Sequence, residues 1–389
     1  RNGIVVALGG ALGGLLVTPA MAAGAVNLDG EIAAPQASPS LIKATPLLLA
    51  QNSSLSEPEE ERFNELLREA QERVDSRDYR GAIGYYQQAL QIDRDNARLY
   101  SGIGYLQLQQ GAYQLATEGY REAIEREPRN VPYRYGLAYS LFQGQRYDEA
   151  ADVYRELIRM APREADAHLG LGGVLLRTEN YDGALAAYEE LVRIAPGNAQ
   201  AYEAIGMMYL QQERYDEALR PLQRAQQLDP NRSSVYASLA QIWIERGNTR
   251  QAEATLREAI RLNPRTAIAH YELAQILKAR GENNAALSHY EEATESDPTL
   301  IPAQAALGEI LLQREQYIRA IVAYRSIVRQ LPNDAGARYN LGLAQYGQGY
   351  TEEAIGTVQY ARRLYLQQED TAGAERAQAL IESWGATVD

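Results

Sequence analysis

Apolar side chains recur along most of this chain with a spacing of three or four residues, which is the period of amphipathic helices. Residues 138–162 show the arrangement clearly, because they read as the end of one helix, a tight turn at Gly144 and Gln145, and a second helix that ends at a proline. The same arrangement returns in residues 173–196 and 207–230, one repeat length of 34 residues later each time. A fixed period of this length predicts an array of helical hairpins.

Nine repeats follow one another without insertion or deletion when position 1 is placed at Phe63. They start at residues 63, 97, 131, 165, 199, 233, 267, 301 and 335. Position 8 is Gly or Ala in every repeat, and position 20 is always Ala. Two helices approach closely only where a side chain is small, so these positions predict the contact inside each hairpin. The representative residues are Gly104, Ala138, Gly172 and Gly206 at position 8, and Ala150, Ala184, Ala218 and Ala320 at position 20.

Prolines and caps agree with these boundaries. A proline stands at position 32 of repeats 2 to 8, where it ends the second helix. Asn130 and Asn198 are placed to cap the helices that follow. Two residues depart from the pattern. Arg94 replaces the expected proline of repeat 1, and Pro221 falls inside the second helix of repeat 5, which we expect it to delay or to kink.

These residues resemble the tetratricopeptide repeat (TPR) family, although none of the nine repeats has the family's tryptophan at position 4. The resemblance implies an all-α, right-handed superhelical solenoid of nine helix–turn–helix repeats over residues 56–368. Residues 369–389 are expected to form a capping helix and a tail. In this last helix Ala374, Ala377 and Ile381 belong to an apolar stripe that would cover the final repeat.

The N-terminal residues predict export. Residues 4–17 are apolar and Gly-rich, and Ala20-Met21-Ala22 matches a signal-peptidase site, so residues 1–22 are interpreted as a signal peptide with a truncated basic region. Fourteen helical residues reach about 21 Å, short of the roughly 30 Å hydrocarbon core. We therefore expect no stable membrane insertion after cleavage before Ala23, with an uncleaved anchor as the alternative. Residues 23–55 read as a disordered linker. The expected location is the periplasm or an equivalent lumen, with membrane association left open.

Charge and composition narrow the class of partner. The formal net charge is −13, and residues 1–55 contribute none of it. Binding to nucleic-acid phosphates needs concentrated Lys and Arg, so a nucleic-acid partner is not expected. The chain has no Cys, which excludes disulfides and thiolate metal sites.

No catalytic constellation can be found in the sequence. His168, His270 and His289 are the only histidines, and the first two occupy position 4, a packing position. Neither a metal site nor a Ser-His-Asp arrangement follows from them. We therefore predict a chain that is not an enzyme and needs no cofactor.

The TPR resemblance implies a concave groove lined by the first helix of each repeat. The candidate groove residues are Tyr105, Tyr135, Tyr139, Phe142, Leu176, Met207, Leu210, Tyr271, Tyr339 and Tyr346. Aromatic grooves of this kind bind extended or helical peptide segments. Our hypothesis is that Tyr135, Tyr139 and Phe142 carry the binding, while the alternative is that some rings pack between repeats. The Lys, Asn and Arg set of the family's carboxylate clamp is missing, which disfavours chaperone tails as ligands.

These observations predict a non-enzymatic scaffold that binds protein or peptide partners. The resemblance to exported bacterial TPR proteins implies a role in assembly or biogenesis of an envelope or membrane complex. The alternative is a substrate-recognition subunit of a separate enzyme, such as a glycosyltransferase or a peptidase. Homo-oligomerisation is left open.

Overall fold

The structure, a computed structural model, describes residues 55–386. Every regular element in this range is an α-helix, which confirms the all-α prediction. The predicted signal peptide and almost all of the predicted linker lie outside the described residues. The right-handed sense of the superhelix stays a prediction.

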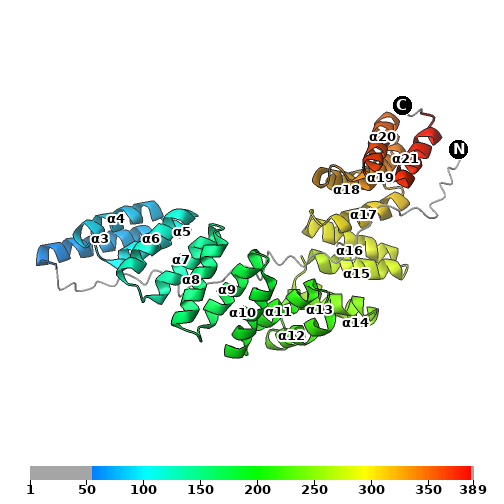
Figure 1. The fold of residues 1–389 in the computed structure, drawn as a ribbon. Coiled ribbons are helices and arrows are strands. Elements are labelled where there is room, and N and C mark those ends of the chain that lie inside the picture. Colours follow the sequence, from blue (N-terminus) through cyan, green and yellow to red (C-terminus); the bar gives the residue numbers. More distant parts are fainter. Residues whose placement is uncertain (1–54, 387–389) are drawn as a thin grey trace. The chain divides into compact units, whose positions relative to one another are not determined.

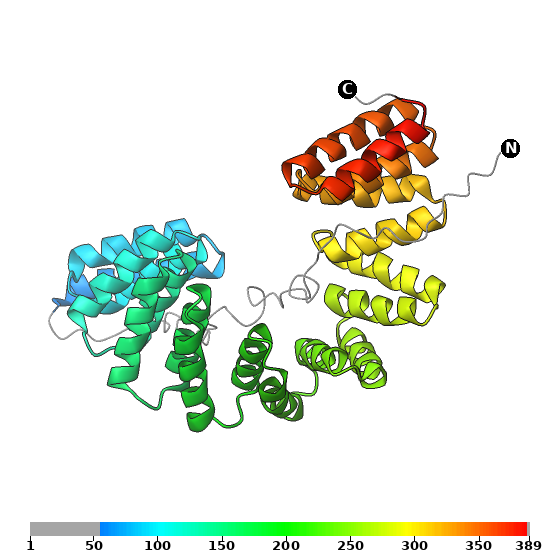
Figure 2. The ribbon, with the colours of Figure 1, turned by 45° about the vertical axis from the view of Figure 1, so that its right-hand side comes forward.

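The described chain divides into two compact units, one ending at Leu228 and the other beginning at Asp229 (Figures 1 and 2). The first unit contains α3 (Glu57–Asp75), α4 (Tyr79–Ile92), α5 (Ala97–Gln109), α6 (Tyr113–Arg126), α7 (Val131–Gln143), α8 (Tyr147–Met160), α9 (Ala165–Arg177), α10 (Tyr181–Ile194), α11 (Ala199–Gln211) and α12 (Tyr215–Leu228). The second unit contains α13 (Ser233–Glu245), α14 (Thr249–Leu262), α15 (Ala267–Ala279), α16 (Asn283–Ser296), α17 (Ile301–Gln313), α18 (Tyr317–Gln330), α19 (Ala335–Gly347), α20 (Thr351–Gln367) and α21 (Thr371–Ser383). Within each unit every helix packs against the next one along the chain.

The first helices of repeats 2 to 9 begin at the residues assigned as repeat starts, from Ala97 for α5 to Ala335 for α19. The first helix of repeat 1 is longer, because α3 begins at Glu57 and not at Phe63. A capping box between Ser56 and Glu59 starts it there. At the other end, α21 packs on α20 and buries Ala374, as a capping helix does.

The turn inside each repeat has one residue in the left-handed backbone conformation, always at position 15. It is Gly111, Gly247, Gly281 and Gly349 in four repeats, and Arg77, Gln145, Glu179, Glu213 and Glu315 in the other five. In repeat 3 the N–H of Arg146 donates to the carbonyl of Leu141 at 2.8 Å, which closes a Schellman motif around Gln145. The backbone conformation of the turn is therefore the same in all nine repeats, although only four of them have glycine at position 15.

Helix starts confirm the predicted caps and correct one expectation. The side chains of Asn130 and Asn198 accept hydrogen bonds from the backbone N–H groups of Tyr133 and Ala201. The prediction that Pro221 could delay its helix is wrong, because α12 begins at Tyr215, the position at which the second helices of all nine repeats begin. The alternative, a kink at Pro221, stays a prediction. Burial of apolar residues along α12 holds the helix in place without the backbone hydrogen bond that Pro221 cannot donate.

Wherever position 8 is glycine, the side chain at position 24 of the same repeat lies against it. The tyrosines at position 24 of repeats 1 to 3 also lie against a glycine at position 6 of the following repeat. A Cβ added to Gly172 would lie 2.7 Å from the ring of Tyr188 at position 24 of the same repeat. A Cβ on Gly170, at position 6, would clash with the ring of Tyr154 from the preceding repeat. The eight structural residues predicted at positions 8 and 20 are all buried, because these rings leave no room beside them.

Position 4, where the family's tryptophan is missing, has a second role in this chain. In several repeats its side chain donates a hydrogen bond to the carbonyl of the position-32 proline that ends the preceding repeat. The Nε2 atoms of His168 and His270 lie 3.0 Å from the carbonyl oxygens of Pro162 and Pro264. The oxygen can only accept, so Nε2 carries the proton in both rings. Arg134, Gln304 and Arg338 donate in the same way to Pro128, Pro298 and Pro332.

The position-24 contact leads to a test with two helical glycines. Gly172→Ala should lower the free energy of unfolding by roughly 1–3 kcal/mol, because the new methyl group overpacks the ring of Tyr188. Gly84→Ala in α4 is the matched control. A Cβ there meets no atom within 4 Å, so the better helix propensity of Ala should stabilise by up to about 1 kcal/mol. Urea unfolding followed by circular dichroism measures both. Equal effects of the two substitutions would contradict the close-packing account.

Candidate functional site

We define the first-helix face as the side chains at positions 5, 9 and 12 of the first helix in each repeat. The structure separates the ten predicted groove residues on this face into two groups. Tyr105, Tyr139, Tyr339 and Tyr346 are half-buried and accessible. Tyr135, Phe142, Leu176, Met207, Leu210 and Tyr271 are buried.

Burial changes the interpretation of Tyr135 and Phe142. Tyr135 is only 1% exposed, and its ring packs edge-on against Tyr154 with centroids 6.4 Å apart. Phe142 packs in the same manner against Tyr147 at 5.5 Å. Both ring contacts lie within the core of repeat 3, whereas the alternative drawn from the sequence was packing between neighbouring repeats. A partner therefore reaches Tyr139 directly, and reaches Tyr135 only if the core opens.

The C-terminal helix covers one of the accessible rings. Tyr346 on α19 stacks on Trp384, which directly follows α21, with ring centroids 4.2 Å apart and ring planes 4° from parallel. This stacking uses one face of Tyr346 within the protein. Tyr339 also contacts the apolar cluster of α20 and α21. Tyr105 and Tyr139, in the first unit, are the accessible rings that no capping helix contacts.

Four buried tyrosine hydroxyls in the first unit have no hydrogen-bond partner among the described residues. They belong to Tyr120, Tyr135, Tyr154 and Tyr188. Burial raises the pKa of each of these four hydroxyls, so each stays protonated. Tyr105 and Tyr139 are near enough to Tyr120 and Tyr154 to raise their pKa further. The accessible rings of α5 and α7 thus lie beside hydroxyls whose hydrogen-bonding capacity is unused.

The second unit satisfies the equivalent hydroxyl. Tyr290 at position 24 donates to Oε1 of Gln275 at 2.6 Å, and Nε2 of Gln275 donates to the hydroxyl of Tyr271 at 2.8 Å. An ion pair then joins neighbouring first helices, because Nζ of Lys278 on α15 donates to Glu309 on α17 at 2.8 Å. The first-helix face of α15 and α17 is consequently polar and internally bonded.

One carboxyl group on α15 is unusual. Burial, together with the charge of Glu245, raises the pKa of Glu272 from its ordinary value of 4.5 to about 7. No hydrogen bond of Glu272 to another described residue offsets this cost. Its neutral form is therefore well populated near pH 7.

Sequence reasoning missed a contact between two histidines. Nδ1 of His270 lies 3.0 Å from Nδ1 of His289. Since His270 already donates through Nε2, its Nδ1 accepts and His289 donates. Burial and the neighbouring His270 lower the pKa of His289. Positions 4 and 23 of one repeat carry this pair, but only the packing of α15 on α16 brings them together. Within residues 55–386 no group of three or more His, Asp or Glu residues is placed to hold a metal ion.

The comparison with protein families decides the class. The model for the "Cilia and flagella-associated protein 70 C-terminal domain", a TPR domain, matches residues 33–306, well over half of the chain. The chain belongs to this TPR family. A general tetratricopeptide-repeat model matches residues 305–367 in addition. Both matches describe helical repeats, and neither identifies a catalytic domain. The TPR array is thus a scaffold for protein–protein interaction.

The chain is also similar to one further TPR protein in sequence and to solved structures. A TPR repeat-containing protein of Picosynechococcus sp. is 37% identical over 65 residues, which is 17% of this chain and 17% of that protein. A tetratricopeptide repeat protein from Parabacteroides merdae matches with a TM-score of 0.50 and 18% identity, over 64% of this chain and 99% of that chain. The Pseudomonas aeruginosa pilF structure matches with a TM-score of 0.48 and 20% identity, over 56% of this chain and 98% of that chain.

Within residues 55–386 no helix combines the length and the apolar composition that a membrane crossing needs.

Glu272 leads to a pH-dependent prediction. A carboxyl group whose folded pKa is raised contributes stability below its unfolded pKa and loses it as the pH rises through the folded value, here about 7. Glu272→Gln removes this loss. Its urea midpoint relative to the unmodified protein should therefore be higher at pH 8 than at pH 5. Glu295→Gln, at an exposed site on α16, is the control. A difference between Glu272→Gln and the unmodified protein that is the same at both pH values would contradict the assignment.

Proposed function

We propose that the TPR array binds a segment of a partner protein on the first-helix face of α5 and α7. The observation that carries this proposal is the pair of accessible rings, Tyr105 and Tyr139, beside buried hydroxyls without partners. Tyrosine offers a large contact area at low cost in side-chain entropy, and it is enriched among residues that dominate binding. The first-helix faces of neighbouring repeats are also adjacent, since α5 contacts α7 directly.

The buried rings support this face from beneath. Tyr135 and Phe142 are fixed by edge-on contacts with second-helix rings, so Tyr139 stands on a rigid surface. A preformed surface loses little entropy when a partner docks.

We also propose that the protein is exported and takes part in assembly or biogenesis of an envelope or membrane complex. The support comes from the sequence alone, from the apolar residues 4–17 and the small residues Ala20 and Ala22 around a cleavage site. A scaffold that binds partner segments would suit such a role.

The first-helix face is tested by removing its accessible rings. The double variant Tyr105→Ala and Tyr139→Ala should lose the partners that the unmodified protein retains in a pull-down from extract, because both rings are removed while Tyr135 and Phe142 keep the core. Arg155→Ala, at an exposed position of the second helix α8, is the matched control and should retain them. Circular dichroism checks that both variants are folded. Recovery of the same partners by the double variant would contradict the proposal.

Export is tested on the protein made by its native cell. Fractionation should recover it outside the cytoplasm, and N-terminal sequencing of that material should begin at Ala23. Retention of residues 1–22 in the exported protein would contradict cleavage, and recovery in the cytoplasm alone would contradict export.

A further inference from the structure

The junction between repeats 1 and 2 is built differently from the later ones. Its position 32 is Arg94, where repeats 2 to 8 have proline. Its position 4 is Tyr100, and the hydroxyl of Tyr100 does not hold the carbonyl of Arg94. Arg126, from the second helix of repeat 2, does so instead, with Nε donating at 3.3 Å. The usual bond across the junction is thus replaced by one from a different helix.

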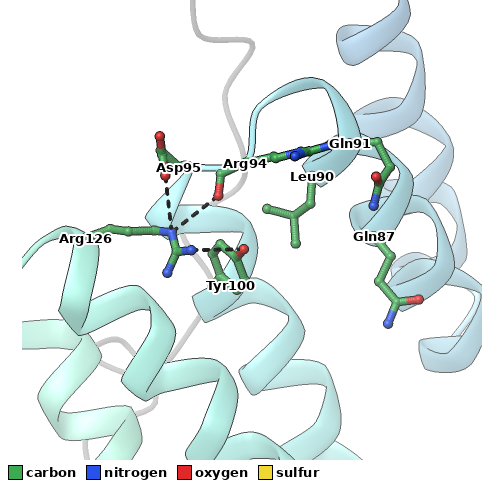
Figure 3. Close-up of a pocket in the computed structure, with 7 residues that line it drawn as sticks. All are labelled: Gln87, Leu90, Gln91, Arg94, Asp95, Tyr100 and Arg126. Atoms are coloured by element: carbon green, nitrogen blue, oxygen red, sulfur yellow. Dashed lines mark hydrogen bonds and ion pairs between the residues drawn. The ribbon is translucent and has the colours of Figure 1, made fainter.

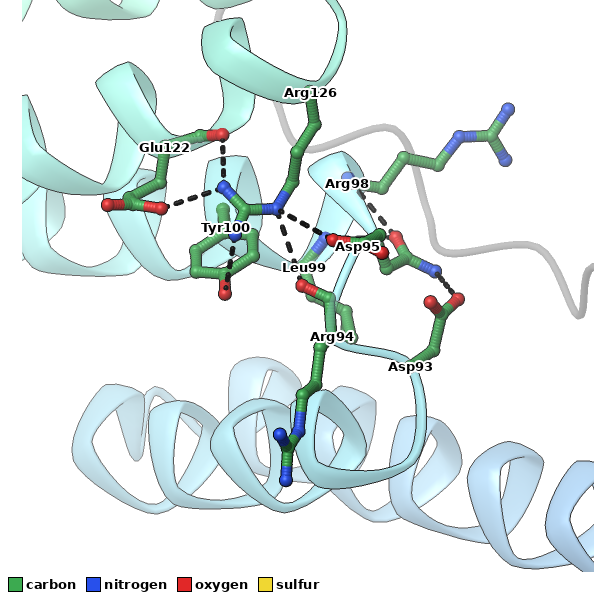
Figure 4. Close-up of polar contacts among 9 residues, drawn as sticks. Asp93, Arg94, Asp95, Arg98, Leu99, Tyr100, Glu122 and Arg126 are labelled. Atoms are coloured by element: carbon green, nitrogen blue, oxygen red, sulfur yellow. Dashed lines mark hydrogen bonds and ion pairs between the residues drawn. The ribbon is translucent and has the colours of Figure 1, made fainter.

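Arg126 is fully engaged in this structural role. Its guanidinium group lies 3.9 Å above the ring of Tyr100 and donates to the hydroxyl of that residue at 3.1 Å. It also donates to the carbonyl and the carboxylate of Glu122 at 2.8 and 2.7 Å, and Asp95 lies 4.0 Å away (Figure 4). Its charge is balanced by these carboxylates, so Arg126 forms a wall and is not free to bind another anion.

A hollow of about 750 Å³ opens beside this wall (Figure 3). Leu90 projects from α4 into the space in front of Tyr100 and Arg126 and gives the hollow an apolar floor. Gln87, Gln91 and Arg94 line the rest of it, with Asp95. The side chains of Gln87, Gln91 and Arg94 form no hydrogen bond or ion pair with any other residue that the structure describes.

The spacing of these three free side chains matches an extended peptide. Gln87 and Gln91 are four residues apart on α4, so they lie on one face of the helix about 6 Å apart along its axis. Peptide groups that point to the same side of an extended chain recur about every 6.6 Å. Two amides at this spacing can each bond one peptide group. Arg94 stands two residues after the last residue of α4. Its guanidinium group would meet a carboxylate at one end of the peptide.

We propose that this hollow is a binding site for an extended peptide that carries a carboxylate. Gln87 and Gln91 bond its backbone, Leu90 contacts one of its side chains, and Arg94 pairs with the carboxylate. The carboxylate is either a C-terminus or a side chain of Asp or Glu. The site lies at the end of the second helix α4 and is separate from the first-helix face, so it does not depend on the proposed function.

The substitution Arg94→Pro tests this site without disturbing the fold. It installs the residue that repeats 2 to 8 have at position 32, and the backbone there has the same turn assignment as at Pro162. The probe is an array of random heptapeptides, made once with free C-terminal carboxylates and once with amidated ends. The full chain, Arg94→Pro and the control Gln88→Ala are each applied to both arrays. Gln88 is exposed and neighbours Gln87, but it points about 100° away around the helix.

The array should yield peptides that the unmodified protein and Gln88→Ala bind equally and that Arg94→Pro binds about tenfold more weakly or worse. Loss on amidation identifies a C-terminal carboxylate, and retention by amidated peptides that contain Asp or Glu identifies a side chain. The double variant Tyr105→Ala and Tyr139→Ala should bind the same peptides, which separates this site from the first-helix face. Absence of any peptide that Arg94→Pro weakens, or weakening that is independent of a carboxylate, would overturn the proposal.

Discussion

The array depends on the packing contacts that the side chain at position 24 makes. This side chain occupies the space left where position 8 of its own repeat is glycine, and in repeats 1 to 3 it also fills the space left by a glycine at position 6 of the next repeat. Tyr154, for example, would clash with any Cβ on Gly170. One ring therefore joins both the two helices of a hairpin and successive hairpins. Because the helices of each unit pack on their neighbours along the chain, each unit is built from a series of such contacts and tolerates local departures such as Pro221.

A second contact links successive repeats. At several junctions a donor at position 4 holds the carbonyl that ends the preceding repeat, as His168 does for Pro162. At the one junction without proline, Arg126 takes over this bond and a hollow remains beside Arg94. The half-buried rings of the first-helix face are another departure, because the hairpin contacts do not require Tyr139. The same helices therefore carry residues whose type is required by packing and residues, such as Tyr139, whose type is not.

The sequence predicted the repeats well because the same small residues return in every period, and the caps at Asn130 and Asn198 follow from local chemistry. It could not tell how deeply a ring on the first-helix face is buried. Tyr135 and Tyr139 are four residues apart on one helix, yet only Tyr135 has Tyr154 packed against it. The repeat pattern also could not predict which side chains meet between two helices. The period placed His270 at a packing position, but its partner His289 depends on how α16 lies on α15.

The central claim is that partners dock on the first-helix face, and site-specific photo-crosslinking in the native cell tests it most directly. A photoreactive phenylalanine analogue replaces Tyr139 in one strain and Arg155, on the second helix of the same repeat, in another. The account predicts a crosslinked partner protein from position 139 and none from position 155. Crosslinks to the same partner from position 155 alone, or equally from both, would contradict it.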